Sequence, residues 1–176
     1  MSNPSTGGAQ TQPTLVPIEM AFGDFTPEFA STRRMLERYP TASGSWRPHE
    51  KSRSLSEVAT HVADIVNRGT LVLTTTGVDI TARIGVEPAD SAAALLALFD
   101  AGVVRFEEVM KTVTAATLAE LWTMRAGPRV ILERPKGALL RQMMMSHMIH
   151  HRAQLGVYYR LLGVPVPGVY GPSADE

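Results

Sequence analysis

From Ala138 to Leu162 the sequence has the apolar spacing of one long α-helix. Pro135 suits the start of this helix, and Gly163 and Pro165 end it. One face of the helix carries, in order, Leu140, Met144, His147, His151, Leu155 and Tyr158. A long helix with such an apolar face must bury it against other long helices, so this segment predicts a helical bundle.

Three further segments with helical spacing can supply the partners. They cover residues 25–39, 54–75 and 92–113. Ser54 and Glu57 have the spacing of a capping box at the start of the second helix. The connection after this helix is long enough to cross the bundle, so helices two and three can run parallel. We therefore predict an all-α chain that folds as a four-helix bundle.

Two parts of the chain do not follow this helical pattern. Between Thr114 and Arg134, TLAELW fits a short turn of helix and RVILE fits a short strand or an extended crossing. Elsewhere there is little convincing strand. Residues 1–17 are rich in Ser, Thr, Gly, Pro and Gln, which predicts a flexible tail. Residues 18–176 are then expected to form a single domain.

Composition excludes several classes of function. The 17 basic and 17 acidic residues give a net charge of zero, which argues against nucleic acid and membranes as partners. No cysteine is present, so disulfides, thiolate metal sites and cysteine nucleophiles are excluded. The N-terminal sequence does not resemble a secretory signal, and no apolar stretch is long enough to span a bilayer. We expect a cytoplasmic protein.

Three histidines are the candidate metal ligands. His147 and His151 are four residues apart, so their side chains leave one face of the helix. His61 lies on a mostly apolar face of the second helix. If these helices meet, the three imidazoles can bind one divalent metal and leave a coordination position open. His147 and His151 have the spacing of the zinc-protease motif H-E-x-x-H, but Met148 replaces its Glu. A zinc protease is therefore excluded.

Other interpretations of the polar residues remain open. Core histidines that are only hydrogen-bonded are a common alternative to metal ligands. His49 lies in a polar loop and is expected at the surface, while His150 points away from the candidate site. Arg152 and Gln154 are either substrate contacts or exposed residues with a salt-bridging role. Asp64 could orient His61 or lie in solvent. Met143, Met144 and Met145 are expected to fill the core or to line an adaptable cavity.

The C-terminal stretch HMIHHRAQLGVYYRLLGVPVPGVYGPSADE resembles the signature of the DinB/YfiT-like superfamily, and SLSEVATHVADI resembles its second-helix motif. The resemblance runs from the first helix to the end of the chain. It implies a four-helix bundle with up-down-down-up connection and a homodimer. By motif position, it also implies a metal triad of His61, His147 and His151.

The resemblance also implies a chemistry. Characterised relatives include metal-dependent thiol transferases, so we expect a thiol-dependent S-transferase that acts on a small electrophile. The expected cofactor is a divalent metal, Zn or Ni first and Fe, Co or Cu otherwise, with a low-molecular-weight thiol as cosubstrate. A metal-dependent hydrolase and a non-enzymatic metal-binding stress-response bundle are the alternatives. No catalytic residue is assigned apart from the metal ligands.

Overall fold

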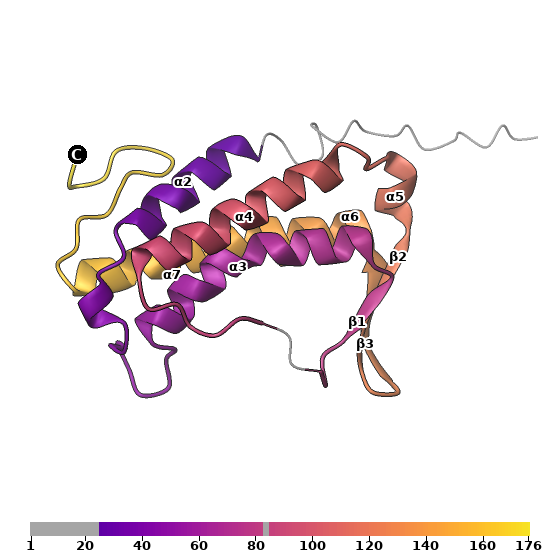
Figure 1. Cartoon of the computed structure of the whole chain (residues 1–176), viewed down its shortest axis with the longest axis horizontal. Coiled ribbons are helices and arrows are strands. Elements are labelled where there is room, and N and C mark those ends of the chain that lie inside the picture. The colour runs from indigo at the N-terminus through magenta and orange to yellow at the C-terminus, as the bar shows by residue number, and fades with distance from the viewer. Residues whose placement is uncertain (1–24, 83–84) are drawn as a thin grey trace, which may run out of the picture.

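The computed structural model describes residues 25–82 and 85–176, so the predicted tail, residues 1–17, lies outside the described residues. Its four long helices are α2 (Thr26–Glu37), α3 (Leu55–Thr74), α4 (Ala92–Met110) and α7 (His147–Leu161). Helix α3 packs on both α4 and α7, and α2 also packs on these two helices (Figure 1). All four helical segments expected from the sequence are therefore present.

Capping residues determine where the helices begin. The Oγ of Ser54 accepts a hydrogen bond from the backbone N–H of Glu57 at 3.3 Å. The Glu57 carboxylate accepts one from the backbone N–H of Ser54 at 2.6 Å, which completes the predicted capping box. Ser91 caps α4 by accepting a hydrogen bond from the backbone N–H of Ala94. Because Ser54 sets the start of α3, it also sets where His61 lies, about two turns later.

The last helical segment is continuous without being a uniform α-helix. A short helix, α6 (Lys136–Leu139), leads into a π-helix, η2 (Leu140–Ser146), which leads directly into α7. The predicted extent of this segment is confirmed, while the π-helix is a finding of the structure. Such segments occur frequently at functional sites.

A small sheet lies at one end of the helices (Figure 1). It consists of β1 (Gly77–Asp79), β2 (Leu121–Ala126) and β3 (Arg129–Pro135). Strand β2 pairs parallel with β1 and antiparallel with β3. A short helix, α5 (Ala115–Ala119), precedes β2, and a 3₁₀ turn (Thr41–Ser43) follows α2. The all-α prediction therefore needs a correction: the fold is mostly helical with a three-stranded sheet.

Two apolar cores hold these elements together. The larger core lies between the long helices and includes Phe29, Leu36, Leu55, Ile65, Phe99, Phe106, Met144 and Leu155. The smaller core joins α3 to the sheet through Val72, Trp122 and Leu139. Gly69 of α3 lies against Met144 so closely that an added Cβ would collide with its sulfur. No helix among residues 25–82 and 85–176 is long and apolar enough to cross a membrane.

Candidate metal centre

Three histidines from two helices meet at one point. His61 lies on α3, and His147 and His151 lie one turn apart on α7. The Nε2 atoms of His61 and His147 are 3.0 Å apart. The ring centroid of His61 is 4.9 Å from that of His147 and 4.5 Å from that of His151, and the two α7 rings are 4.6 Å apart. The three residues chosen from the sequence thus form one cluster.

The cluster fits a single metal ion. Two imidazole nitrogens bound at about 2.0–2.1 Å in tetrahedral geometry lie about 3.3 Å from each other. The 3.0 Å separation of His61 Nε2 and His147 Nε2 is close to this value. One ligand nitrogen from each of the three residues lies within 4.8 Å of the others. Small side-chain rotations would bring all three into coordination distance of one ion.

Burial keeps these imidazoles neutral at pH 7, which metal binding requires. Burial, together with a smaller effect of the Arg68 cation, lowers the pKa of His61 to about 3. Burial also lowers the pKa of His147 to about 4, with smaller contributions from His151 and Arg68. The pKa of His151 is lowered as well, again chiefly by burial. Each ring therefore retains a lone pair that a cation can accept.

Hydrogen bonds orient the two imidazoles on α7. The Nδ1–H of His151 donates to Oε1 of Gln154 at 2.6 Å, which leaves the lone pair on Nε2. The His147 imidazole is hydrogen-bonded to the backbone of Met143 in η2, which raises its pKa slightly against the effect of burial. Partners of this kind fix the tautomer and the orientation of a metal ligand. Gln154 is exposed, as one of its two sequence interpretations expected, and it also orients a candidate ligand.

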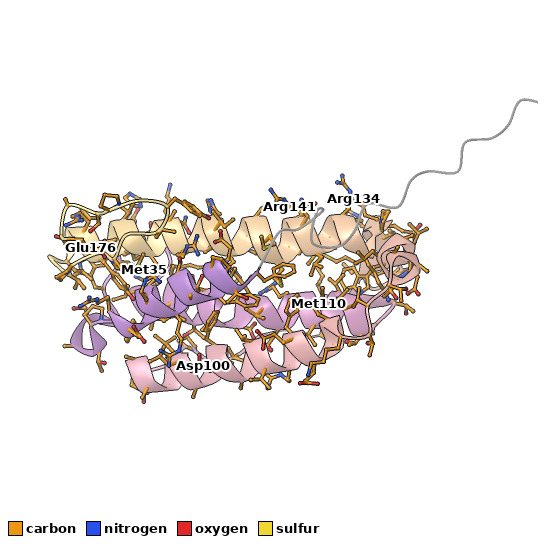
Figure 2. All side chains as sticks on the ribbon, turned by 90° about the horizontal axis from the view of Figure 1, so that it is seen from above. Met35, Asp100, Met110, Arg134, Arg141 and Glu176 are labelled. Atoms are coloured by element: carbon orange, nitrogen blue, oxygen red, sulfur yellow. The ribbon has the colours of Figure 1, made fainter. Side chains whose placement is uncertain are left out.

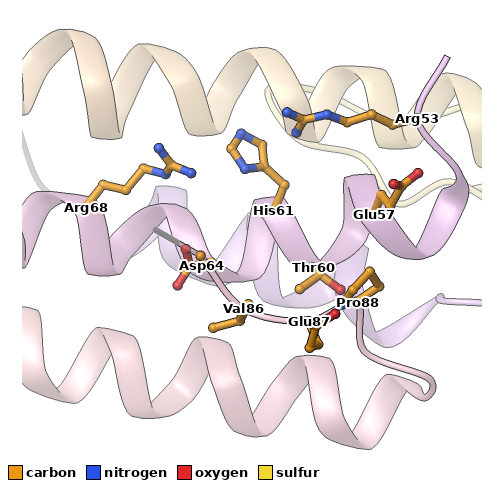
Figure 3. Close-up of a pocket in the computed structure, with 10 residues that line it drawn as sticks. Arg53, Glu57, Thr60, His61, Asp64, Arg68, Val86, Glu87 and Pro88 are labelled. Atoms are coloured by element: carbon orange, nitrogen blue, oxygen red, sulfur yellow. The ribbon is translucent and has the colours of Figure 1, made fainter. Parts of the chain in front are cut away.

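A pocket of about 310 Å³ opens beside His61. Its walls come from α3 and from the loop that precedes α4, and they include Thr60 and Asp64. The His61 imidazole points toward α7, with Arg53 and Arg68 on either side of it (Figure 3). A small molecule can therefore approach the histidine cluster, as a metal centre with an open coordination position requires.

Comparison with known families identifies the family of this chain. Residues 25–155 match the model of the family described as the DinB superfamily. The chain belongs to the DinB superfamily. This membership confirms the resemblance that the two histidine-bearing sequence motifs suggested.

Two solved structures of DinB-like proteins have similar folds. One, from Bacillus cereus ATCC 10987, has 25% sequence identity and a TM-score of 0.63, covering 87% of this chain and 97% of that one. The other, YjoA from Bacillus subtilis, has 20% identity and a TM-score of 0.62, covering 83% and 95%. The uncharacterized protein YrdA of Bacillus subtilis (strain 168) is 45% identical over 42 residues, 24% of this chain and 25% of YrdA. That last match spans about a quarter of the relative's length.

The remaining polar candidates of this DinB-superfamily chain lie outside the cluster. His49 is exposed in its loop, as predicted, and accepts a hydrogen bond from the backbone of Lys51. His150 is also exposed and contacts only the edge of the cluster, through His151. The Asp64 carboxylate accepts a hydrogen bond from Asn67 and does not orient His61. None of these three residues belongs to the histidine cluster itself, although Asp64 lines the pocket beside it.

Arg152 is buried and paired. Its side chain is 2% exposed and forms an ion pair with Glu28 at 2.7 Å. It also donates hydrogen bonds to the hydroxyls of Thr32 and Tyr170. The salt-bridging role expected of Arg152 is therefore present, but its expected exposure is wrong: the ion pair is buried and ties α7 to α2, and Tyr170 adds the C-terminal segment.

The methionine run divides between two environments. Met144 and Met145 are buried in the larger core, which confirms their expected role as core residues. Met143 packs against the smaller core instead and lines a second pocket beside Trp122. The run therefore both fills the core and lines a cavity.

The metal-free protein is expected to lose stability as the pH falls from 7 to 5. The folded-state pKa values of His61 and His147, about 3 and 4, lie below the ordinary value of 6.5. The unfolded chain therefore takes up protons first, so stability is full above pH 6.5 and falls as the pH approaches the folded values. Because both rings are partly exposed, we expect a combined loss of about 2 kcal/mol, about half the undiscounted value. Urea unfolding of chelator-treated protein at both pH values measures it.

The double variant His61→Gln/His147→Gln provides the control for this pH dependence. It retains polar side chains at both positions but cannot titrate in this range. Its free energy of unfolding is expected to change much less between pH 7 and pH 5 than that of the wild type. Equal pH dependence in both proteins would show that other groups cause the loss.

Proposed function

We propose that His61, His147 and His151 bind one divalent metal ion and that the chain is a metal-dependent enzyme, a thiol-dependent S-transferase acting on small electrophiles. The observation that carries this proposal is the convergence of three neutral imidazoles beside an open pocket. Zn and Ni are the first candidates for the metal, because imidazole nitrogen suits both ions.

The chain's own residues would bind and orient the reactants. The three imidazoles would hold the ion, and Gln154 would keep the His151 Nε2 lone pair directed at it. A divalent metal bound there lowers the pKa of a thiol or water molecule that reaches it. The pocket beside His61 offers space for the electrophile. With water in place of the thiol, the same site would support the alternative, a metal-dependent hydrolase.

A purely structural metal site is less well supported. Structural zinc sites are usually closed by four protein ligands. Among the described residues, the cluster that could hold an ion contains only the three histidines. A bundle held together by metal would therefore leave a coordination position open beside a pocket, which is the arrangement of a catalytic site.

The proposed activity can be tested with metal-loaded protein, a low-molecular-weight thiol and monochlorobimane as the electrophile. Cysteine, glutathione, mycothiol and bacillithiol would each be supplied as the thiol. We expect conjugation by the wild type and a rate at least about a hundredfold lower for His147→Ala, because several kcal/mol of charge stabilisation are lost. The fluorescence of the bimane conjugate measures both rates.

His150→Ala is the matched control, since His150 is an exposed histidine on the same helix. It should conjugate at the wild-type rate. Equal rates for wild type, His147→Ala and a reaction without protein would contradict the transferase assignment. Hydrolysis of an activated ester by the wild type alone would then favour the hydrolase alternative.

We further infer the up-down-down-up helix order and the homodimer that the family resemblance implies. The long connection between α3 and α4 supports the helix order, because it runs back along the molecule (Figure 1). The exposed apolar side chains of Val157 and Leu161 on α7 support a contact with a second copy.

A further inference from the structure

Arg68 lies next to the histidine cluster and has no ion-pair partner in the part of the chain that the structure describes. It lies on α3 two turns after His61, and its guanidinium points toward the His61 ring (Figure 3). Among residues 25–82 and 85–176 it forms no ion pair, and its buried Nε has no hydrogen-bond partner. The carboxylate of Asp64, one turn earlier, is engaged by Asn67 instead. A buried polar atom without a partner is uncommon, and an absent ligand is one explanation.

Arg68 also borders a second, apolar pocket. This pocket, about 210 Å³ in volume, lies between α3 and the sheet and has mainly apolar walls. Trp122, Met124 and Met143 contribute large side chains to it. Arg68 lines both this pocket and the polar pocket beside His61, so the two pockets meet at its side chain. An apolar cavity that ends at an unpaired guanidinium suits a ligand with an apolar part and an anionic end.

The polar pocket carries charges of both signs, the guanidinium groups of Arg53 and Arg68 and the carboxylates of Glu57, Asp64 and Glu87. Arg53 lies on the other side of His61 and adds a second positive charge (Figure 3). The nearby Glu57 carboxylate is already used in the capping box of α3. Arg152, by contrast, is paired with Glu28 in the protein interior. Arg68 is therefore available to a ligand in a way that Arg152 is not.

We propose that Arg68 binds the oxyanion group, a carboxylate or a phosphate, of a small molecule whose short apolar chain occupies the pocket over Trp122. Guanidinium pairs with either oxyanion through two parallel hydrogen bonds. The identification of this molecule as the substrate rests on the proposed function, since the oxyanion would lie beside the metal centre. Binding itself depends on Arg68 and the apolar pocket and needs no metal.

Calorimetric titration of chelator-treated, full-length protein tests the proposal with butanoate, pentanoate and hexanoate as probes. Affinity should rise about fourfold with each added methylene while the apolar pocket fills. Hexanamide, which lacks the charge, should bind at least about tenfold more weakly than hexanoate. Pentyl phosphate, compared with hexanoate, distinguishes the two oxyanions, and tighter binding of either one supports the proposal.

Arg68→Gln should weaken hexanoate binding by about tenfold or more, because a charge-assisted pair is lost. Arg68→Lys should fall between this variant and the wild type, since it keeps the charge but not the fork. Arg141→Gln is the control for net charge, because Arg141 projects from the outer surface of η2 (Figure 2). Unfolding temperatures of all three variants show whether a loss of binding reflects a loss of fold.

Unchanged hexanoate binding in Arg68→Gln, or equal binding of hexanoate and hexanamide, would overturn the proposal. Metal analysis of the same samples separates this outcome from a failure of the proposed function. Arg68→Gln should bind as much zinc as the wild type, because all three histidines remain. A wild type that binds hexanoate through Arg68 but takes up no metal would support the anion site and contradict the metalloenzyme.

Discussion

Replacing His147 with alanine is expected to reduce bound metal from about one ion per chain to a small fraction of that. His147 Nε2 lies 3.0 Å from His61 Nε2, so it is well placed to share an ion with His61. Structural zinc sites with four ligands are worth about 10–16 kcal/mol, or about 3 kcal/mol per ligand, so losing one ligand weakens binding about a hundredfold. Elemental analysis of protein purified without an affinity-metal step, followed by zinc titration, measures this change.

The histidine next to the cluster supplies the matched control for metal binding. His150→Ala removes an exposed imidazole beside His151 and should leave the metal content unchanged. His61→Ala and His151→Ala should behave like His147→Ala. A folded wild type that takes up neither Zn nor Ni would refute the metal centre. The 3.0 Å contact between His61 and His147 would then be a hydrogen bond between core imidazoles.

Arg152→Ala is expected to lower the free energy of unfolding by about 3–5 kcal/mol, the usual cost of removing one partner of a buried ion pair. The Arg152 side chain is 2% exposed and that of Glu28 is 15% exposed. Without the guanidinium, the Glu28 carboxylate would lose its cation and, among the described residues, keep the hydroxyl of Tyr170 as its partner. Thr32 would lose a hydrogen-bond donor as well. Urea unfolding followed by circular dichroism measures the loss.

A second arginine on α7 provides the comparison for this loss. Arg160 pairs with Asp175 at 2.8 Å, but its side chain is 51% exposed. Arg160→Ala should therefore cost no more than about 1 kcal/mol. Both variants remove an ion pair of α7, so the difference between them isolates the effect of burial. Similar small losses in both would mean that water replaces the missing partner of Glu28.

The parts of this fold that could be predicted depend on contacts close in sequence. The capping box of Ser54 and Glu57 involves residues three apart, and the structure contains both of its hydrogen bonds. His147 and His151 are four apart in an apolar helix, so local spacing directed both toward the interior. His61 required the additional assumption that α3 meets α7, which the structure confirms.

The features that could not be predicted depend on distant partners. Strand β1 has three residues and pairs with β2 more than forty positions later, so no alternating pattern identifies it. Arg152 is buried because Glu28, far away in sequence, neutralises it, whereas an arginine is ordinarily placed at the surface. The role of Gln154 depends on the tautomer of His151, which composition and spacing do not reveal.

The number of residues in the π-helix η2 determines how the helices on either side of it are rotated relative to each other. Compared with an α-helix it accommodates an extra residue, and one residue corresponds to about 100° of rotation about the axis. Leu139, before it, faces Trp122, while His147, after it, faces α3. Loss of a single residue from Leu140–Ser146 would leave both helices intact yet turn one of these faces away from its partner. The π-helix thus sets the rotation of α7 relative to α6, and we expect substitutions within it to be tolerated more readily than deletions.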